Sequence, residues 1–228
     1  NFYQQGFAEK LQSVGARCPQ LILAEHCANG NLVLVVTKLP GVERRKLSFP
    51  HMLSAVTWLA RLHGSFWGDR ANAAVECGLQ PQGCFWNLDA CKDELQQCTS
   101  AGLVSRLRLA AVALDARLKL DKMQTICHGD PKDHNIIVDD SGSAAFFDFQ
   151  WVGKGPAAKD LAYCLICASG SLKAGDEEAY LRRYHGELKV MLERLGEVPP
   201  SFEEVKESYL LAVCDLARWM AGCSYGWW

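Results

Sequence analysis

The sequence has no excess of charge of either sign, which argues against a nucleic-acid partner. Its 228 residues include 24 Lys and Arg against 26 Asp and Glu, and the formal net charge is -2. Nucleic-acid-binding proteins usually carry a basic patch or stripe. The short basic groups at 44–46 and 182–183 are interpreted as solvated side chains. We therefore predict no nucleic-acid partner.

Long hydrophobic runs are also missing. The longest ones, residues 32–36 and 161–168, are far shorter than the roughly 20 residues that cross a bilayer. We predict no membrane partner. Neither an initiator methionine nor a signal sequence precedes Asn1, and the last residue is the apolar Trp228. We therefore expect a chain that is truncated.

The 11 cysteines lack the paired spacing of a secreted disulfide framework. A reducing compartment fits this usage best, so we predict a cytoplasmic protein. Cys164 and Cys167 form a Cys-x-x-Cys pair that could hold a metal or act in redox chemistry. Because the pair lies in an apolar helical run with no second pair of ligands nearby, two core cysteines are favoured.

Hydrophobic periodicity predicts a small strand-bearing part at the start of the chain. Apolar residues at helical spacing predict a helix over residues 2–14. Short apolar runs at 21–24 and 32–36, with a turn signal at 29–31 between them, predict a hairpin.

From about residue 48, helical periodicity dominates. The predicted helices cover residues 48–67, 103–118 and 201–220. The last one begins at a capping box, Ser201-x-x-Glu204. Residues 68–87 are rich in Gly, Asn and Gln, which predicts a surface loop.

A cluster of polar residues interrupts this helical pattern. Strand-like runs at 136–138 and 144–147 predict a second hairpin. Asp130 and Asn135 bracket a short loop before it, and Asp148 ends it. Pairing of the two strands would place Asp148 beside Asn135. Such oxygen-bearing side chains suit Mg²⁺, which takes one or two carboxylates together with substrate phosphates.

The spacing matches a known phosphoryl-transfer pattern. Phosphoryl transfer needs metal ions that neutralise the phosphates and a carboxylate that accepts the proton of the attacking hydroxyl. In protein kinases the catalytic Asp lies five residues before a metal-binding Asn, and a second metal-binding Asp begins Asp-Phe-Gly. Asp130 and Asn135 have the same spacing, and Asp148-Phe149 is followed by Gln150. This joint pattern outweighs the simpler alternative, in which Asp130 only caps a turn.

Further motifs carry a family resemblance. They are His128-Gly-Asp130, Asp148-Phe-Gln150 and Gly155-Pro-x-x-x-Asp160-Leu-Ala-Tyr163. Together they resemble the aminoglycoside phosphotransferase and choline kinase-like superfamily. The Phe-Gln ending, the Leu-Ala-Tyr and an upstream Arg61-Leu-His63-Gly-x-Phe-Trp67 are most similar to its ecdysteroid kinase-like (CHK kinase-like) branch.

The resemblance implies an α+β, protein-kinase-like fold. Residues 41–228 would form the helical C-terminal catalytic lobe, and residues 1–40 would be a remnant of the N-terminal lobe and hinge. The implied reaction is transfer of the γ-phosphate of ATP to a hydroxyl of a small-molecule alcohol. The oligomeric state is not predicted.

The resemblance also implies roles for single residues. Asp130 would be the catalytic base, Asn135 and Asp148 would hold Mg²⁺, and Lys132 would reach the γ-phosphate. His128 would brace the loop by bonding to backbone near Asp148.

Two further implied roles lie outside this loop. Asp160 would anchor the loop from the following helix, although a simple helix cap is the alternative. Backbone groups of Val35, Val36 and Thr37 would meet the adenine of ATP.

His63, on an apolar helix face, is interpreted as a core histidine.

Two parts of the family pattern are missing, which leaves alternatives open. No Gly-x-Gly loop occurs before residue 30, and Lys10 and Glu9 lie on a helical pattern where the family has a strand lysine and its partner. One alternative is a catalytically inactive kinase-like module that binds a nucleotide or a partner. Another is a metal hydrolase that uses His128, Asp130, His134 and Asp148, in which Asn135 has no role.

The acceptor is not specified by the sequence. Aromatic residues between Trp67 and Trp86 and near the C-terminus could form a cage for a quaternary ammonium or a face for a sterol-like alcohol. The C-terminal ones are Trp219, Tyr225, Trp227 and Trp228. Core packing is the simpler interpretation of all of them.

Overall fold

The computed structural model describes residues 2–27, 30–97 and 102–222. Helices dominate these residues, and three small sheets complete the fold. The helices are α1 (Phe7–Ser13), α2 (Phe49–Ser65), α3 (Asp69–Glu76), α4 (Lys92–Gln97), α5 (Leu103–Lys119), α6 (Ala157–Ala168), α7 (Asp176–Arg194) and α8 (Phe202–Gly222). The strands are β1 (Leu21–His26), β2 (Leu32–Val36), β3 (Val42–Glu43), β4 (Gln124–Cys127), β5 (Ile136–Val138), β6 (Ala144–Phe146) and β7 (Gly153–Pro156), with a 3-10 turn, η1 (Asp133–Asn135).

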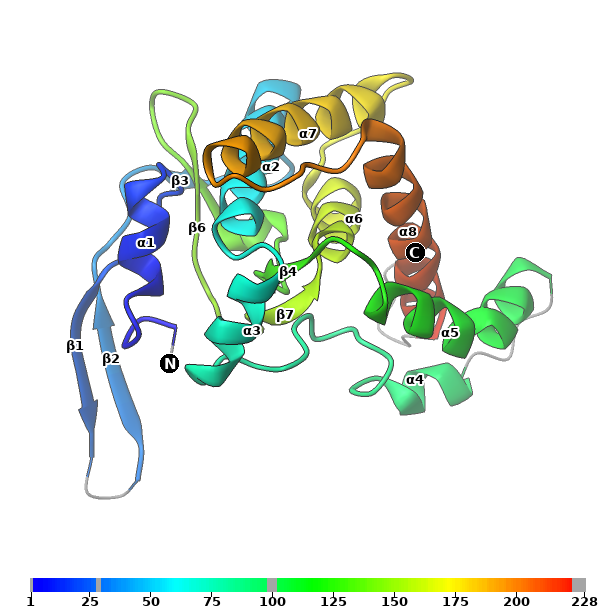
Figure 1. Cartoon of the computed structure of the whole chain (residues 1–228), viewed down its shortest axis with the longest axis horizontal. Helices are drawn as coiled ribbons and strands as arrows, with labels where there is room; N and C mark the ends of the chain where they lie inside the picture. Colours follow the sequence, from blue (N-terminus) through cyan, green and yellow to red (C-terminus); the bar gives the residue numbers. More distant parts are fainter. Residues whose placement is uncertain (1, 28–29, 98–101, 223–228) are drawn as a thin grey trace.

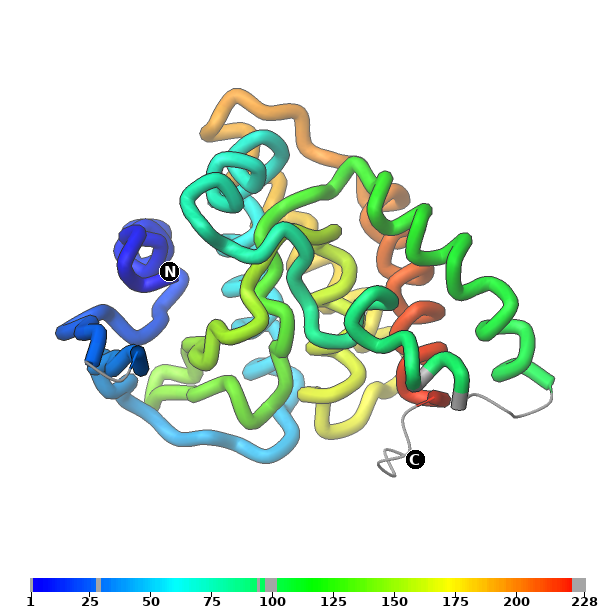
Figure 2. Tube along the Cα trace, turned by 90° about the horizontal axis from the view of Figure 1, so that it is seen from below, coloured from blue at the N-terminus to red at the C-terminus, as the bar shows by residue number. Residues whose placement is uncertain are grey.

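The elements form an elongated arrangement. Figure 1 places α1 and the β1–β2 hairpin at one end of the molecule, and α5 and α8 at the other. Figure 2, turned by 90°, shows the same separation. The strands β4 to β7 and the loops between them lie in the middle, where α2 and α6 pack against them.

The predicted N-terminal helix and hairpin are both confirmed. The helix α1 is shorter than predicted, because residues 2–6 form turns before it. β1 and β2 pair antiparallel, with Leu21 opposite Val36 and His26 opposite Leu32. Part of the predicted turn at 29–31 lies outside the described residues.

The three long predicted helices are confirmed as α2, α5 and α8. The capping box at the start of α8 is present, because the Ser201 N–H donates to Glu204 Oε2 over 2.8 Å and the Glu204 N–H donates to Ser201 Oγ over 3.2 Å. These two bonds satisfy backbone donors that have no partner within the helix. On the apolar face of α5, Leu118 is buried together with Ala111 and Asp115, Leu107, Ala110 and Leu114 are half-buried, and Leu103 is exposed.

The predicted surface loop over residues 68–87 is wrong. It contains the helix α3 and several buried side chains, namely Ala71, Ala74, Leu79, Cys84 and Trp86. Gly83 donates its N–H to the Lys154 carbonyl over 2.8 Å, and a Cβ at Gly83 would lie 2.6 Å from the Gly153 carbonyl oxygen. The glycine therefore permits close approach of two backbones, which the composition alone does not distinguish from a flexible loop.

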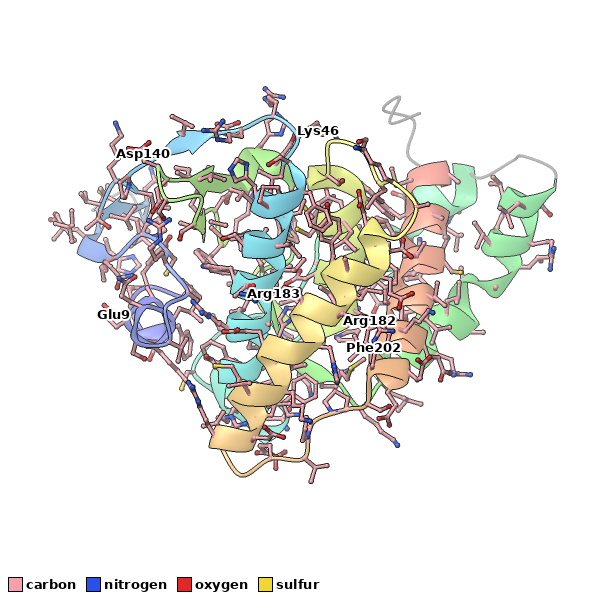
Figure 3. All side chains as sticks on the ribbon, turned by 90° about the horizontal axis from the view of Figure 1, so that it is seen from above. Glu9, Lys46, Asp140, Arg182, Arg183 and Phe202 are labelled. Carbon is pink, nitrogen blue, oxygen red and sulfur yellow. The ribbon has the colours of Figure 1, made fainter. Side chains whose placement is uncertain are left out.

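One continuous core runs through the molecule. It includes Phe2 near the start of the chain and Trp219 in α8. Phe2 stacks on Phe149, with ring centroids 4.0 Å apart, so the N-terminal segment packs directly against the centre. Figure 3 shows α7 crossing α2, where Arg183 Nε donates to Thr57 Oγ1 over 2.8 Å. Within the described residues, no helix is long and apolar enough to cross a membrane.

Candidate active site

The loop that carries Asp130 follows a buried strand. β4 pairs antiparallel with β7 and ends at Cys127, and His128, Gly129 and Asp130 come next. Gly129 has a φ of 88°, and a Cβ there would lie 2.2 Å from the Trp151 carbonyl oxygen. Only glycine fits this position, because the conformation and the space both exclude a side chain.

Asp160 fixes this loop from the first turns of α6. Its Oδ2 accepts the His128 N–H over 2.6 Å, and its Oδ1 accepts the Gly129 N–H over 3.0 Å. His63 Nε2 lies 3.1 Å from Oδ2, and His63 Nδ1 lies 2.9 Å from the Tyr184 hydroxyl. All of these bonds are buried, so the loop backbone is held by a carboxylate that is itself oriented from α2. The interpretation of His63 as a satisfied core histidine is confirmed.

His128 joins the loop to the end of β6. Its Nε2 donates to the Phe147 carbonyl over 2.9 Å, and its Nδ1 accepts the Asp130 N–H over 3.3 Å. This pair of bonds requires the neutral tautomer with the proton on Nε2. Burial lowers the pKa of His128 and outweighs the opposite effect of nearby carboxylates, Asp160 first among them.

Asp130 has one engaged and one unengaged carboxylate oxygen. Oδ2 accepts from Lys132 Nζ over 2.7 Å and from Asn135 Nδ2 over 3.0 Å. Oδ1 is buried and has no hydrogen-bond partner among the described residues. A buried acceptor without a donor costs free energy, and such atoms in native proteins are often functional. The free oxygen is therefore a candidate acceptor for a substrate proton.

The Tyr163 hydroxyl is a second buried polar group without a partner in the described part of the chain. Burial raises its pKa, and the charges and polar side chains of Cys167 and Asp130 raise it further. Tyr163 belongs to the Leu-Ala-Tyr motif, but nothing in that motif indicates where its hydroxyl lies. It lies near Asp130 because α6 packs beside the loop.

Asn135 and Asp148 lie at neighbouring ends of the β5–β6 hairpin. The Phe147 N–H donates to the Asn135 carbonyl over 3.1 Å, next to the paired residues Ile136 and Phe146. Asn135 Nδ2 also donates to the Asp130 backbone carbonyl over 2.8 Å, which leaves the side-chain Oδ1 of Asn135 for another ligand. Asp148 has a φ of 64°, a region that few residues other than Gly adopt.

These donors fit a magnesium ion. Mg²⁺ prefers carboxylate and amide oxygens and few protein ligands. The Asp148 carboxylate accepts one long bond, from Gln150 Nε2 at 3.4 Å, so it keeps free lone pairs. The metal hydrolase alternative has no such support. Within the described residues, the ligand cluster that groups closely is His63, Cys127 and Asp160, and it contains none of the four residues that alternative needs.

Asp148 also borders a cavity of about 400 Å³. Tyr3, Leu34 and Gln150 line the same cavity. Val35 and Val36 continue β2 from Leu34, and Thr37 follows the strand, with its N–H bonded to the Gln20 carbonyl over 2.8 Å. Leu34 lines the cavity, but Val35, Val36 and Thr37 are not among its lining residues, and Lys132 borders a different cavity.

Several other candidates are structural. Cys164 is buried, and Cys167 partly so, in α6, as the core interpretation predicted. Trp67, Trp86 and Trp219 are buried as well, so the core interpretation of these aromatics is confirmed. Tyr225, Trp227 and Trp228 lie outside the described residues.

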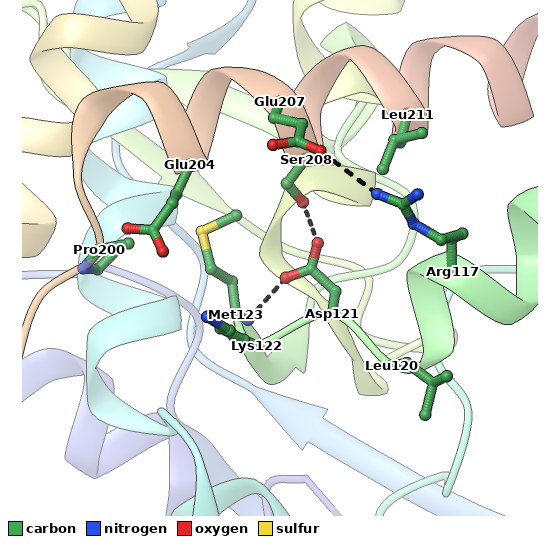
Figure 4. Close-up of a pocket in the computed structure, with 10 residues that line it drawn as sticks. All are labelled: Arg117, Leu120, Asp121, Lys122, Met123, Pro200, Glu204, Glu207, Ser208 and Leu211. Carbon is green, nitrogen blue, oxygen red and sulfur yellow. Dashed lines mark hydrogen bonds and ion pairs between the residues drawn. The ribbon is translucent and has the colours of Figure 1, made fainter.

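A cavity of about 260 Å³ lies between α5 and α8, away from this loop (Figure 4). Its polar groups bind one another: Asp121 Oδ2 accepts from Ser208 Oγ, Asp121 Oδ1 accepts the Met123 N–H, and Arg117 pairs with Glu207. Since these groups are mutually satisfied and none is a predicted site residue, we interpret this cavity as a packing feature between two helices.

Comparison with known proteins identifies a family for the chain. The model of the phosphotransferase enzyme family matches residues 4–197. No curated protein matches the chain by sequence.

Solved structures of similar fold exist. A macrolide 2'-phosphotransferase from Brachybacterium faecium is 18% identical, with 97% of this chain and 77% of that one covered and a TM-score of 0.55. A choline/ethanolamine kinase family protein from Mesorhizobium loti is 14% identical, with 96% and 81% covered and a TM-score of 0.56. An aminoglycoside-3'-phosphotransferase of type VIII is 18% identical, with 92% and 80% covered and a TM-score of 0.53. The predicted α+β, kinase-like phosphotransferase fold is confirmed.

Proposed function

The chain belongs to the phosphotransferase enzyme family, and we propose that it transfers the γ-phosphate of ATP to a hydroxyl group of a small molecule. The observation that carries this proposal is the buried, unpartnered Oδ1 of Asp130, on a loop whose backbone and second oxygen are fixed. The names of the similar structures, which include a macrolide phosphotransferase and a choline/ethanolamine kinase family protein, support acceptors of this chemical class.

In the proposed reaction, Asp130 Oδ1 accepts the proton of the acceptor hydroxyl. The hydroxyl oxygen forms a bond to the γ-phosphorus, and the bond from that phosphorus to the β–γ bridging oxygen breaks, which releases ADP. Lys132 contributes positive charge beside the transferred group. Its Nζ is held 2.7 Å from Asp130 Oδ2, so the charge is positioned before any substrate binds.

We propose that Asn135 Oδ1 and the Asp148 carboxylate hold Mg²⁺. When bound there, the ion neutralises phosphate charge and orients the phosphates. The bond from Asn135 Nδ2 to Asp130 couples the proposed metal ligand to the proposed base. His128 and Asp160 act as positioning residues, because His128 Nδ1 accepts the Asp130 N–H and Asp160 Oδ1 accepts the Gly129 N–H, and neither binds the free oxygen of Asp130.

For the nucleotide, we propose that residues 1–40 form the part of the molecule that faces adenine, with backbone of Val35, Val36 and Thr37 in the hinge. Residues 41–228 then form the catalytic lobe. The cavity beside Leu34 and Asp148 supports this division, since it lies between the two parts. Asp148-Phe-Gln150 and Leu161-Ala-Tyr163 support placement in the ecdysteroid kinase-like branch.

An acceptor screen tests the proposed function. Purified protein is incubated with ATP, Mg²⁺ and a panel of small alcohols, and phosphorylated products are detected by mass spectrometry. We expect at least one alcohol to gain a phosphoryl group in the presence of Mg²⁺ and not in the presence of EDTA. If no alcohol is phosphorylated but ATP still binds, the chain is instead an inactive nucleotide-binding module.

A further inference from the structure

A cavity of about 540 Å³ lies beside the proposed base. It is bordered by the loop before α2, by the catalytic loop through Lys132, and by the end of α6. Its volume is in the range of small-molecule sites, which is about 300–1,000 Å³. Lys132 lines this cavity and its ammonium lies 2.7 Å from Asp130 Oδ2, so one side chain borders both the cavity and the proposed base.

The cavity is lined by three basic side chains, Arg45, Lys46 and Lys132, and by one carboxylate, Asp133. Two of the cations also have partners outside the lining, since Lys132 pairs with Asp130 over 2.7 Å and Arg45 lies 3.9 Å from Glu43. Both oxygens of Asp133 are already engaged, since Oδ2 accepts the Lys46 N–H over 3.0 Å and Oδ1 lies 2.8 Å from His134 Nδ1. Asp133 therefore offers little to a cationic ligand.

The Lys46 ammonium forms no close ion pair among the described residues, although the Asp133 carboxylate is nearby. The ammonium donates to the Cys167 carbonyl over 2.9 Å, and Asp133 Oδ2 accepts the Lys46 N–H. The φ of Lys46, 58°, lies in the left-handed region, and the bond from its N–H to Asp133 fixes it there. Figure 3 shows Lys46 at the edge of the molecule, beside the start of α2. An ammonium at an exposed edge, without a close ion-pair partner, suits an anion that enters from solvent.

Part of the lining is apolar. Ile166 and Cys167 of α6 contribute to it, together with Met220 of α8. Burial raises the pKa of Cys167 to about 11, so the thiol is uncharged at neutral pH. The cavity thus offers both cationic and apolar groups to one ligand.

We infer that the acceptor is an alcohol with an anionic group, such as a carboxylate, on an apolar body. This inference rests on the proposed function, because it assigns the acceptor to the cavity beside Lys132. The anionic group lies against Lys46 and Arg45, the apolar body lies against α6, and the hydroxyl reaches Asp130. An acceptor with several amino groups would meet like charge on the wall and is disfavoured.

Equilibrium binding of three matched alcohols tests the inference. The probes are 4-(hydroxymethyl)benzoate, the neutral 1,4-benzenedimethanol and the cationic 4-(aminomethyl)benzyl alcohol, with dissociation constants measured by ligand-observed NMR. We expect the benzoate to bind at least about tenfold more tightly than the other two, because a charged hydrogen bond contributes more than a neutral one. We also expect its affinity to fall with added salt.

Variants assign the effect to the cavity. Lys46→Gln should weaken the benzoate about tenfold and leave the neutral alcohol unchanged. Arg45→Gln, at an exposed position where folding is not at risk, should weaken the benzoate in the same direction. Lys189→Gln, an exposed lysine of α7, is the matched control and should change nothing.

The inference is overturned if the three probes bind equally, if the cationic probe binds best, if none binds, or if the two cavity variants behave like the control. Turnover is measured separately, so the two proposals can fail independently. Selective benzoate binding without any ATP-dependent phosphorylation would reject the proposed function and keep the charge preference. Phosphorylation of only neutral or cationic alcohols would support the proposed function and reject the charge preference.

Discussion

Asp148 has a strained backbone conformation at a position where we propose a metal ligand. Its φ of 64° places a residue with a Cβ in the left-handed region, at a cost of about 1–2 kcal/mol. Its carboxylate forms one long bond, to Gln150, which does little to offset that cost. A strained residue that keeps free oxygens is the pattern expected of a metal ligand rather than of a packing residue.

This strain gives a matched pair of variants. Asp148→Gly and Asp148→Ala both remove the carboxylate, so both should lose phosphoryl transfer. The glycine variant should be more stable than the alanine variant by about 1 kcal/mol, because glycine adopts positive φ without a steric penalty. Urea unfolding of the two variants measures the difference. Equal stabilities would show that the backbone at Asp148 is not strained.

His128 makes stability depend on pH. Burial lowers its pKa in the folded protein, whereas the unfolded chain has an ordinary value near about 6.5. Below that value the unfolded chain binds a proton that the folded protein does not, so the free energy of unfolding falls as the pH decreases. The limiting slope for one such group is about 1.4 kcal/mol per pH unit.

We predict that His128→Gln reduces this slope between pH 6.5 and pH 5, relative to the wild type, as measured by urea unfolding at several pH values. His26→Gln, at an exposed position of β1, is the control and should keep the wild-type slope. A wild-type slope in His128→Gln would mean that other groups cause the acid destabilisation.

The proximity of the residues with fixed spacing could be predicted from the sequence, whereas contacts between distant segments could not. Asp130, Asn135 and Asp148 were identifiable because their spacing and the hairpin between them are local features. The free oxygen of Asp130 and the hydroxyl of Tyr163 were not, since both depend on how α6 packs beside the loop. His63 could be recognised as a core residue, but its bond to Asp160 joins positions far apart in the chain.

Hydrophobic periodicity predicted the helices that bury large apolar side chains and missed a helix that buries small ones. α2 and α8 were predicted because large apolar side chains recur at helical spacing. α3 was missed because its buried face consists of Ala71 and Ala74, which give a weak signal. The backbone contact of Gly83 with Gly153 likewise leaves no pattern in the sequence.

Two glycines in different elements should respond in opposite ways to alanine. Gly83→Ala would place a methyl group 2.6 Å from the Gly153 carbonyl oxygen, so it should destabilise by about 1–3 kcal/mol. Gly186, in the middle of α7, has no atom within 4 Å of its ideal Cβ. Gly186→Ala should therefore stabilise by about 0.5–1 kcal/mol. Thermal unfolding of both variants measures the signs, and a shared sign would contradict the assigned packing.

At the scale of the whole molecule, the proposed base lies on a loop that is held from several elements. β4 delivers the loop, Asp160 of α6 binds its backbone, and His128 connects it to the end of β6. Phe2 and Phe149 join the N-terminal segment to this centre by ring stacking. Two separate cavities lie near this loop, one lined by Asp148 and the other by Lys132.

The most direct test compares wild type with Asp130→Asn in steady-state phosphorylation of an acceptor found in the screen, with nucleotide affinity measured in parallel. The variant keeps the size of the side chain but cannot accept a proton on Oδ1. We predict that kcat falls by roughly 10²- to 10⁴-fold while the affinity for ATP with Mg²⁺ is unchanged. A variant that retains wild-type kcat would contradict the role of Asp130 as the base.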